Sequence, residues 1–317
     1  MKQPRRFPSV LRKLTYPAAF VSAPLLTYFL PILTPIHPSL ALSLTLLGLG
    51  CLILFLEHRY PQYSEWRPQG AAVRADLLHT FISTPLPSLL ISAVGVGFVQ
   101  ELLDQSHLGS LTQVWPNQWS LLSQVCFALL LSELGAYWIH RTFHLNRFFW
   151  RAHALHHTPR GLYTLASARN HPFNVIAIYT ARAIPVALFG AKPEVLACLS
   201  AINGIHGILQ HSNLELEIGP LNHVLAGPEL HRRHHSILLE DSRKNFGNIL
   251  ILWDKLFGTF SLPKGENFGP NPGVGVEELE ISESYPAHLA LPFMLTQWET
   301  LSLPDPRALT PLGESDS

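Results

Sequence analysis

The sequence predicts an all-α fold: an integral membrane helical bundle of about four spans, with a histidine-rich helical cap on its cytoplasmic side. Three observations support this fold class. Only 14% of the 317 residues are charged, against about a quarter in soluble proteins, and the mean hydropathy is positive. Long apolar stretches fill the first half of the chain. Beyond them, histidines recur at helical spacing in three short clusters.

The overall charge argues against one class of partner. The 22 basic and 22 acidic residues balance to a net charge of zero, and basic and aromatic residues do not alternate anywhere in the chain. Proteins that bind nucleic acid present a positive surface, so we expect no nucleic acid partner. The 3 cysteines lie far apart in apolar stretches, which indicates packing residues rather than disulfides or zinc ligands.

The first membrane segment is expected to be a helical hairpin. Apolar residues run from about Tyr16 to Ile36 and again from Leu40 to Leu56, with His37-Pro38 between the two runs. Basic residues precede the first run, as they do in a signal peptide, but this run is longer than the roughly 7–15 residues of a signal core. We therefore predict two spans with a turn at His37-Pro38.

Two further spans are expected after the polar loop Glu57–Arg74. The third covers about Leu77–Val99 and contains two prolines, which a membrane helix tolerates when its neighbours satisfy the freed carbonyls. A short loop, Asp104–Trp119, leads to the fourth span at about Ser120–Ile139. Residues 1–139 thus form the predicted N-terminal membrane region.

Basic residues predict the orientation. The N-terminal arm and the Glu57–Arg74 loop contain Lys and Arg, whereas the two opposite turns contain neither, so the arm and the loop are expected in the cytoplasm. Four spans return His140 to the same side, which places the histidine clusters on the cytoplasmic face. Between the second and third clusters, two short apolar runs predict a hairpin at about 174–210 that dips into the membrane.

The histidine clusters have the spacing of metal ligands. His140 and His144 lie four positions apart, so both imidazoles leave one face of a helix. The second and third clusters each have the pattern HxxHH, whose members again share a helical face. These clusters are His153, His156, His157 and His231, His234, His235. A lone histidine is more often a core or surface residue, but three clusters exceed what one ion can bind and predict two ions.

The residues alone do not choose the metal, because neutral imidazole suits iron, zinc, copper and nickel. A zinc hydrolase needs only three protein ligands and an open position, so many histidines without thiolates fit a two-metal redox centre better. A metal-dependent lipid hydrolase is the alternative enzyme. A membrane protein that stores or moves metal ions is the non-enzymatic alternative, but a transporter holds its ligands near the middle of its spans rather than at one surface.

The histidine clusters occur in a longer series of motifs. In order, these are HRTFH (140–144), HALHH (153–157), the isolated histidine of LQHSNLEL, PELHRRHHS (228–236) and NFGNILILWDKLFGTF (245–260). From about Ser120 to Phe260 the chain resembles the fatty acid hydroxylase superfamily, most closely its sterol-desaturase-like branch. The resemblance implies a catalytic domain at 140–260 with two iron ions and O2 as co-substrate. It also implies hydroxylation or desaturation of an unactivated C–H bond in a sterol, fatty acyl or related lipid.

The resemblance also implies a set of metal ligands. The three clusters match the family's motifs directly, and His211 matches its lone ligand between the second and third motifs. His206 precedes His211 by five positions, about 140° around an ideal helix, so it joins the set only if the helix is interrupted. The full predicted set is His140, His144, His153, His156, His157, His206, His211, His231, His234 and His235.

Other polar residues near the motifs are candidate catalytic or orienting groups. The second nitrogen of a ligating imidazole needs an acceptor. Glu133 lies two helical turns before His140 and could orient a histidine of another motif, and Asn245 could do the same or shape the substrate entrance. His171 precedes a proline and either caps a helix or binds metal. His288 is expected to face solvent.

The remainder, residues 261–317, is rich in Gly, Pro and acidic residues. We expect a cytoplasmic tail that covers the metal domain, with a short amphipathic helix at Leu289–Trp298. The chain has no haem segment like that of a fused cytochrome b5 domain, so a separate electron donor of the cytochrome b5 or ferredoxin type is expected. Taken together, the sequence predicts a multi-pass protein of a bacterial inner membrane or the endoplasmic reticulum.

Overall fold

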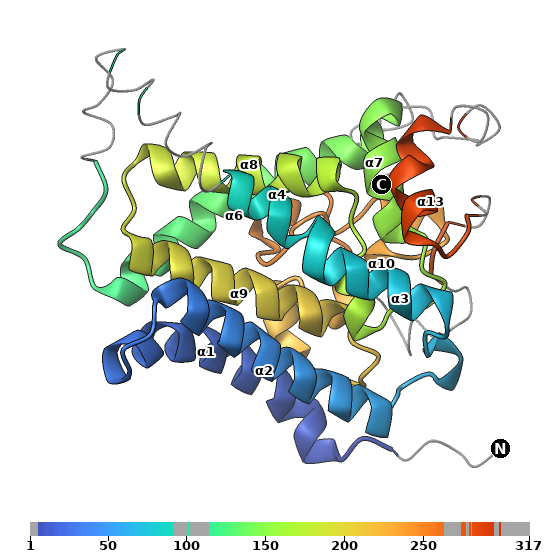
Figure 1. Ribbon diagram of the computed structural model, residues 1–317, viewed down its shortest axis with the longest axis horizontal. Helices are drawn as coiled ribbons and strands as arrows, with labels where there is room; N and C mark the ends of the chain where they lie inside the picture. Colours follow the sequence, from blue (N-terminus) through green and yellow to red (C-terminus); the bar gives the residue numbers. More distant parts are fainter. Residues whose placement is uncertain are drawn as a thin grey trace, which may run out of the picture.

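The computed structural model describes residues 6–91, 101, 105, 114–262, 274–276, 279, 281–294 and 298. These residues form helices joined by short connections, and within them β-structure is limited to two isolated bridges. The predicted all-α fold class is confirmed. The long helices run side by side along the longest axis of the molecule (Figure 1).

The N-terminal hairpin forms as predicted, from α1 (Ser9–Leu33) and α2 (Pro38–Arg59). His37 caps α2, since its Nδ1 accepts a hydrogen bond from the backbone N–H of Ser39, and Pro38 fills the first helical position, where its missing N–H costs nothing. Both helices are long and apolar enough to cross a membrane, and so is α6 (Leu121–Leu145). The described residues therefore contain three candidate spans.

The predicted third span is interrupted. α3 (Ala71–Leu78) continues into a π-helical turn, η2 (His79–Ser83), and then into α4 (Pro85–Leu90). The later part of this span, from residue 92, lies outside the described residues, as does much of the Asp104–Trp119 loop. At the end of that loop Trp115 is buried, and its Nε1 donates a hydrogen bond to Gln124 Oε1 (2.7 Å).

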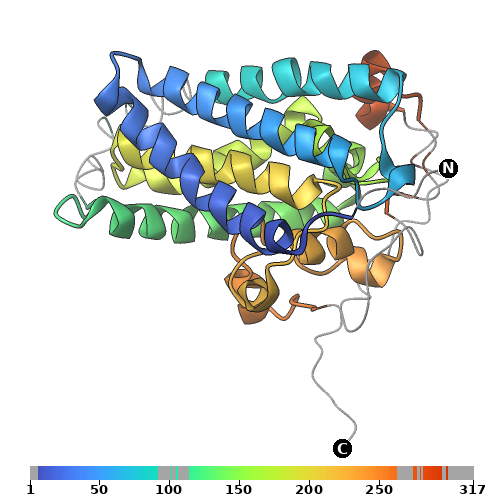
Figure 2. The ribbon, with the colours of Figure 1, turned by 90° about the horizontal axis from the view of Figure 1, so that it is seen from below.

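The hairpin predicted at about 174–210 consists of α8 (Pro172–Leu188) and α9 (Pro193–His211). α9 lies in the middle of the bundle, with the α1–α2 hairpin on one side and α6 on the other (Figure 2). α8 packs closely on α6 at Gly135. A Cβ atom at this position would collide with the carbonyl oxygen of Ala181, so only glycine permits the two helices to approach so closely. This hairpin is therefore a central part of the bundle's core.

The cap collects at one end of the bundle. It begins with α7 (Arg147–His157) and η5 (Thr164–Ala168), and it continues after α9 with η6 (Gly219–His223), α10 (Pro228–His234), α11 (Leu239–Ser242) and α12 (Leu252–Leu256). Figure 1 shows α7 and α10 near the end at which α9 terminates. α6 is one continuous helix through His140, so the domain boundary that we placed between residues 139 and 140 falls inside a helix.

The C-terminal segment folds back onto the cap. α13 (Tyr285–Ala290) and η7 (Leu291–Phe293) replace the helix that we expected at Leu289–Trp298, of which residues 295–297 lie outside the described residues. Leu291 and Trp298 pack on the buried face of α7. The expectation that His288 faces solvent is wrong: α13 packs against α3, and His288 is fully buried beside His79.

Candidate metal centre

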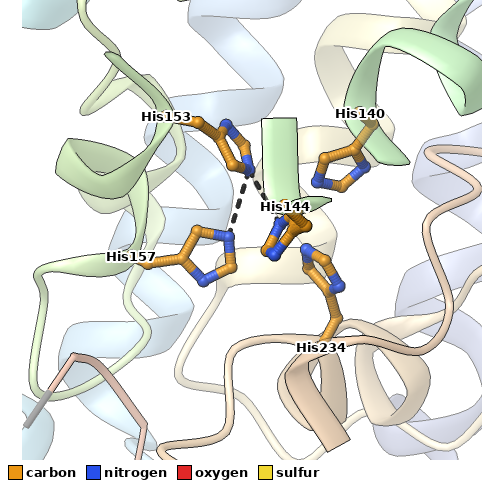
Figure 3. Close-up of side chains that lie close together, drawn as sticks. All are labelled: His140, His144, His153, His157 and His234. Carbon is orange, nitrogen blue, oxygen red and sulfur yellow. Dashed lines mark hydrogen bonds between the residues drawn. The ribbon is translucent and has the colours of Figure 1, made fainter. Parts of the chain in front are cut away.

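Nine buried histidines form two groups at the cap end of the bundle. Within each group, one nitrogen of every ring lies within 4.8 Å of the corresponding nitrogens of the others. The five-histidine group contains His140 and His144 from α6, His153 and His157 from α7, and His234 from α10. The four-histidine group contains His156, His211, His231 and His235. Figure 3 shows the five rings of the first group arranged around a common centre.

Each HxxHH motif divides its histidines between the two groups. In the second motif, His153 and His157 belong to the five-histidine group and His156 to the other. In the third motif, His231 and His235 belong to the four-histidine group and His234 to the five-histidine group. On a helix, positions i and i+4 lie 40° apart, while position i+3 lies on the other side of i, at about 60°. We expected one shared face for each motif. The two groups instead interlock, and the rings of His157 and His235 stack with centroids 4.2 Å apart.

Backbone carbonyls fix which nitrogen of several rings carries the proton. The Nδ1 atoms of His140 and His234 lie 2.7 Å and 2.9 Å from the carbonyl oxygens of Phe246 and Lys244. In the other group, the Nδ1 atoms of His156 and His211 face carbonyl oxygens in the same way. A carbonyl only accepts, so each of these Nδ1 atoms donates a proton and each Nε2 is left with a bare lone pair.

The bare Nε2 atoms fit metal ions. Those of His156 and His211 face each other at 3.2 Å, and neither has a proton to donate. The Nε2 atoms of His140 and His234 are buried and have no hydrogen-bond partner among the described residues. Lone pairs that converge in a buried site are unfavourable unless a cation lies between them. Because the donor set is all imidazole, it suits iron, zinc, copper or nickel.

Burial keeps the cap histidines neutral and ready to ligate. Removal from water, followed by the influence of neighbouring imidazoles, holds the pKa values of His231, His234 and His235 well below the usual value. Apolar rings enclose the five-histidine group: Phe143 stacks on His153, with centroids 5.3 Å apart, while Trp150 and Phe246 lie against the same group. This enclosure limits the access of water to the site.

The structure places His206 in neither histidine group, although we had predicted it as a ligand. Its Nε2 donates to the carbonyl oxygen of Ala226 (3.1 Å), and its Nδ1 accepts from the hydroxyl of Tyr16 (2.6 Å). α9 runs without interruption from Pro193 to His211, so the five-residue separation turns His206 away from the centre. Both of its nitrogens are satisfied within the protein.

Glu133 and Asn245 do not contact the imidazoles as we had expected. Glu133 is fully buried: it pairs with Arg182 of α8, and its Oε2 accepts from the backbone N–H groups of Ile249 and Leu250. Asn245 fastens a neighbouring segment, since its side chain exchanges two hydrogen bonds with the backbone of Ser261, both 2.9 Å. Both residues support the chain around the site rather than the ligands directly.

His171 caps α8, since its Nδ1 accepts from the N–H of Phe173. Capping, one of its two expected roles, is therefore its role in this structure.

Sequence reasoning missed the groups that orient the clustered histidines. Asn174 Oδ1 faces Nδ1 of His153 (3.0 Å), and backbone carbonyls orient His140, His156, His211 and His234. The sequence of a segment does not reveal where its carbonyls will point. For Asn174, the only sequence signal was a side-chain amide, which can accept a hydrogen bond from an imidazole, close to the motif that contains His171.

Comparisons with known proteins agree with the site. A family model described as fatty acid hydroxylase matches residues 125–259. The ornithine lipid hydroxylase of Rhizobium tropici is 31% identical over 247 residues, which cover 76% of this chain and 72% of that protein. The human alkylglycerol monooxygenase is 32% identical over 177 residues, which cover 55% of this chain and 38% of that protein.

A more distant relative is a very-long-chain aldehyde decarbonylase of Oryza sativa subsp. indica, 26% identical over 190 residues, which cover 59% of this chain and 66% of that protein. No solved structure matches the chain. The matched region contains all nine clustered histidines. The chain therefore belongs to the fatty acid hydroxylase family and is a membrane oxidoreductase, a lipid oxygenase.

Proposed function

We propose that this protein is a di-iron, O2-dependent hydroxylase of a polar membrane lipid. The observation that carries the proposal is the pair of facing Nε2 atoms of His156 and His211, both without a proton, inside a site with a second such group beside it. Two interlocked all-imidazole groups suit a pair of redox-active ions better than the three-ligand site of a zinc hydrolase.

The residues of the site have separable tasks in this proposal. The two groups hold one ion each, and the shared HxxHH motifs fix the distance between the two ions, since α7 and α10 each contribute to both groups. When bound, a pair of iron ions supplies the redox chemistry that reduces O2 and oxidises a C–H bond. Phe143, Trp150 and Phe246 exclude water, which protects the reaction from side reactions.

Hydroxylation is the reaction that the relatives favour over desaturation. The names of the first two relatives describe a hydroxylase of ornithine lipids and a monooxygenase of alkylglycerols. Both names describe lipids with a polar head rather than sterols. We propose the hydrocarbon chain of such a lipid as substrate, and the exposed apolar residues of α1, α2 and α4 give the bundle a surface that suits a bilayer.

The electrons are proposed to come from a separate donor of the cytochrome b5 or ferredoxin type, and the metal centre is proposed to face the cytoplasm. Basic residues in the N-terminal arm and in the Glu57–Arg74 loop support this orientation.

Metal analysis combined with oxygen consumption tests the proposal. The full chain, purified in detergent and loaded with iron, should bind two ions and consume O2 in the presence of a reductant and an ornithine lipid or an alkylglycerol. In isotopically labelled O2, the product lipid should gain one labelled oxygen atom. Release of a fatty acid without O2 consumption would instead identify a hydrolase. Metal binding without any lipid product would favour a metal-handling protein.

Cysteine labelling tests the orientation separately. In a chain whose own cysteines have been replaced, a cysteine placed within Asp104–Trp119 should react with an impermeant reagent added outside the cell. A cysteine placed near Arg67 should react only after the membrane is permeabilised. The reverse pattern would invert the proposed topology without affecting the proposed reaction.

A further inference from the structure

The motif that follows the third histidine cluster contains a buried aspartate, Asp254, that contacts no imidazole. Its Oδ1 accepts from the N–H of Phe246 (2.7 Å) and from the hydroxyl of Thr259 (2.6 Å), and its Oδ2 accepts from the N–H of Gly247 (2.6 Å). The side chain is fully buried in α12. Asp254 therefore fixes the orientation of two consecutive peptide groups.

These peptide groups belong to the segment that orients the five-histidine group. The carbonyl oxygen of Phe246 accepts from Nδ1 of His140, and the carbonyl oxygen of Lys244 accepts from Nδ1 of His234. Two ligands from different motifs, one on α6 and one on α10, thus take their ring orientation from residues 244–246.

This segment has a conformation that needs external support. Asn245 has a φ of 56°, which is unusual for a residue other than glycine. At Gly247, a Cβ atom would lie 2.7 Å from Oδ2 of Asp254, closer than real contacts allow, so the chain passes directly over the carboxylate. Strained backbone persists only when its surroundings hold it in place. Here Asp254 accepts from two of the segment's N–H groups, and the carbonyl oxygen of Thr259, which Asp254 also binds through its hydroxyl, accepts from the N–H of Asn245.

The four-histidine group is oriented independently. The Nδ1 atoms of His156 and His211 face the carbonyl oxygens of Arg169 and Gly207, which lie in a loop and within α9, far along the chain from Asp254. A substitution of Asp254 is therefore expected to disturb the ring orientation of the five-histidine group and to leave that of the four-histidine group unchanged.

We propose that Asp254 is a positioning residue for the metal ion of the five-histidine group, acting through the backbone of Phe246 and Gly247. The inference rests on the proposed binding of one ion in each group. This role explains why the motif WDKLFGTF has an aspartate at this position. The two carboxylate oxygens of Asp254 face three hydrogen-bond donors, so both oxygens must be acceptors. Asparagine has the same shape but one oxygen fewer, and its NH2 group would face a donor.

The test measures the binding of Co²⁺ alone to the full, metal-free chain in detergent. Two backgrounds isolate the groups: His231→Ala with His235→Ala leaves the five-histidine group intact, and His144→Ala with His157→Ala leaves the other. In the first background, Asp254→Asn should weaken Co²⁺ binding by about 10–100-fold. In the second, it should change the affinity by less than about 2-fold. The matched control is Asp241→Asn, because Asp241 is a partly buried aspartate of the cap that pairs with Arg233 and accepts no hydrogen bond from Phe246 or Gly247.

The results separate this inference from the proposed function. Equal weakening in both backgrounds, or none in either, would overturn the positioning role while leaving the metal centre in place. An unsubstituted chain that binds no Co²⁺ would overturn the metal centre and the positioning role together. If Asp254→Asn does not fold, Thr259→Val removes one of the three donors, and the same selective loss, several-fold in size, is then required.

Discussion

His211 and His206 lie on the same helix, are both fully enclosed, and differ in what their nitrogens contact. His211 directs one nitrogen to the carbonyl of Gly207 and the other to the imidazoles of His156 and His231. His206 has a protein partner for each nitrogen, Ala226 and Tyr16. The comparison shows that burial does not identify a ligand. The histidines of the two groups differ from His206 because each directs a ring nitrogen at other imidazoles.

Removal of a ligand should have the largest effect. His153→Ala or His234→Ala takes one nitrogen from the five-histidine group without removing a span, so the protein should remain in the membrane and lose all measurable lipid oxidation. The measurement is product formation in isolated membranes, with immunodetection of the protein as a control. Turnover in either variant would contradict the ligand assignment.

A change at Glu133, which holds the backbone near the metal centre without contacting an imidazole, should have an intermediate effect on activity. Glu133→Gln keeps an acceptor for Ile249 and Leu250 but loses the charge that faces Arg182. We expect activity to fall by about 10–100-fold and to recover in part with added iron, as for other groups that orient ligands indirectly. Unchanged activity would reduce Glu133 to a packing residue. Complete loss of both ions would instead indicate that it binds metal.

A change at His206 tests the contrast between His206 and His211 directly. His206→Ala removes a buried ring and leaves the Tyr16 hydroxyl without its acceptor, so the chain should lose about 2–4 kcal/mol of stability. The folded protein should still bind both ions. Thermal unfolding and metal content measure the two effects separately, and Tyr16→Phe is a milder control. Loss of an ion from folded His206→Ala protein would restore His206 to the ligand set.

The smallest effect is expected at His288, another buried histidine outside the metal centre. Burial, and then the nearby Arg169 and His79, lower its pKa to about 3. Because the unfolded chain has a histidine pKa of about 6.5, only the unfolded state takes up this proton as the pH falls below that value. The contribution of neutral His288 to stability is thus fully present above pH ~6.5 and lost toward lower pH.

His288→Gln removes this titration. The stability advantage of the unsubstituted chain over the variant should shrink between pH 7 and pH 5, by at most about 1.4 kcal/mol per pH unit. Thermal unfolding of both proteins across this range measures it, and metal content should not differ between them. A constant difference would show that His288 titrates normally in the folded protein.

Local physics was enough to predict that the histidines of each motif lie close together. His140 and His144 lie four positions apart on one apolar helix, so any fold of that helix brings their rings to one face. The same rule placed His153 beside His157 and His231 beside His235, but it also put His156 and His234 on those faces, whereas the structure places them in the opposite groups. The apolar runs also predicted the α1–α2 hairpin, because no other structure satisfies so long an apolar backbone in lipid.

The sequence by itself therefore determined the long apolar helices, their membrane setting and the histidine pairs four positions apart, since these depend on neighbours within a few positions. Only the tertiary structure decided which pair joins which third histidine, and that Glu133 and Asp254 hold the segment 244–250 rather than a ligand. It also decided that His288 is buried and His206 satisfied. The physical reason is that these partners lie on other segments of the chain, from 7 residues away for Asp254 and Gly247 to 209 for His79 and His288. Their positions follow from packing, which no local pattern encodes.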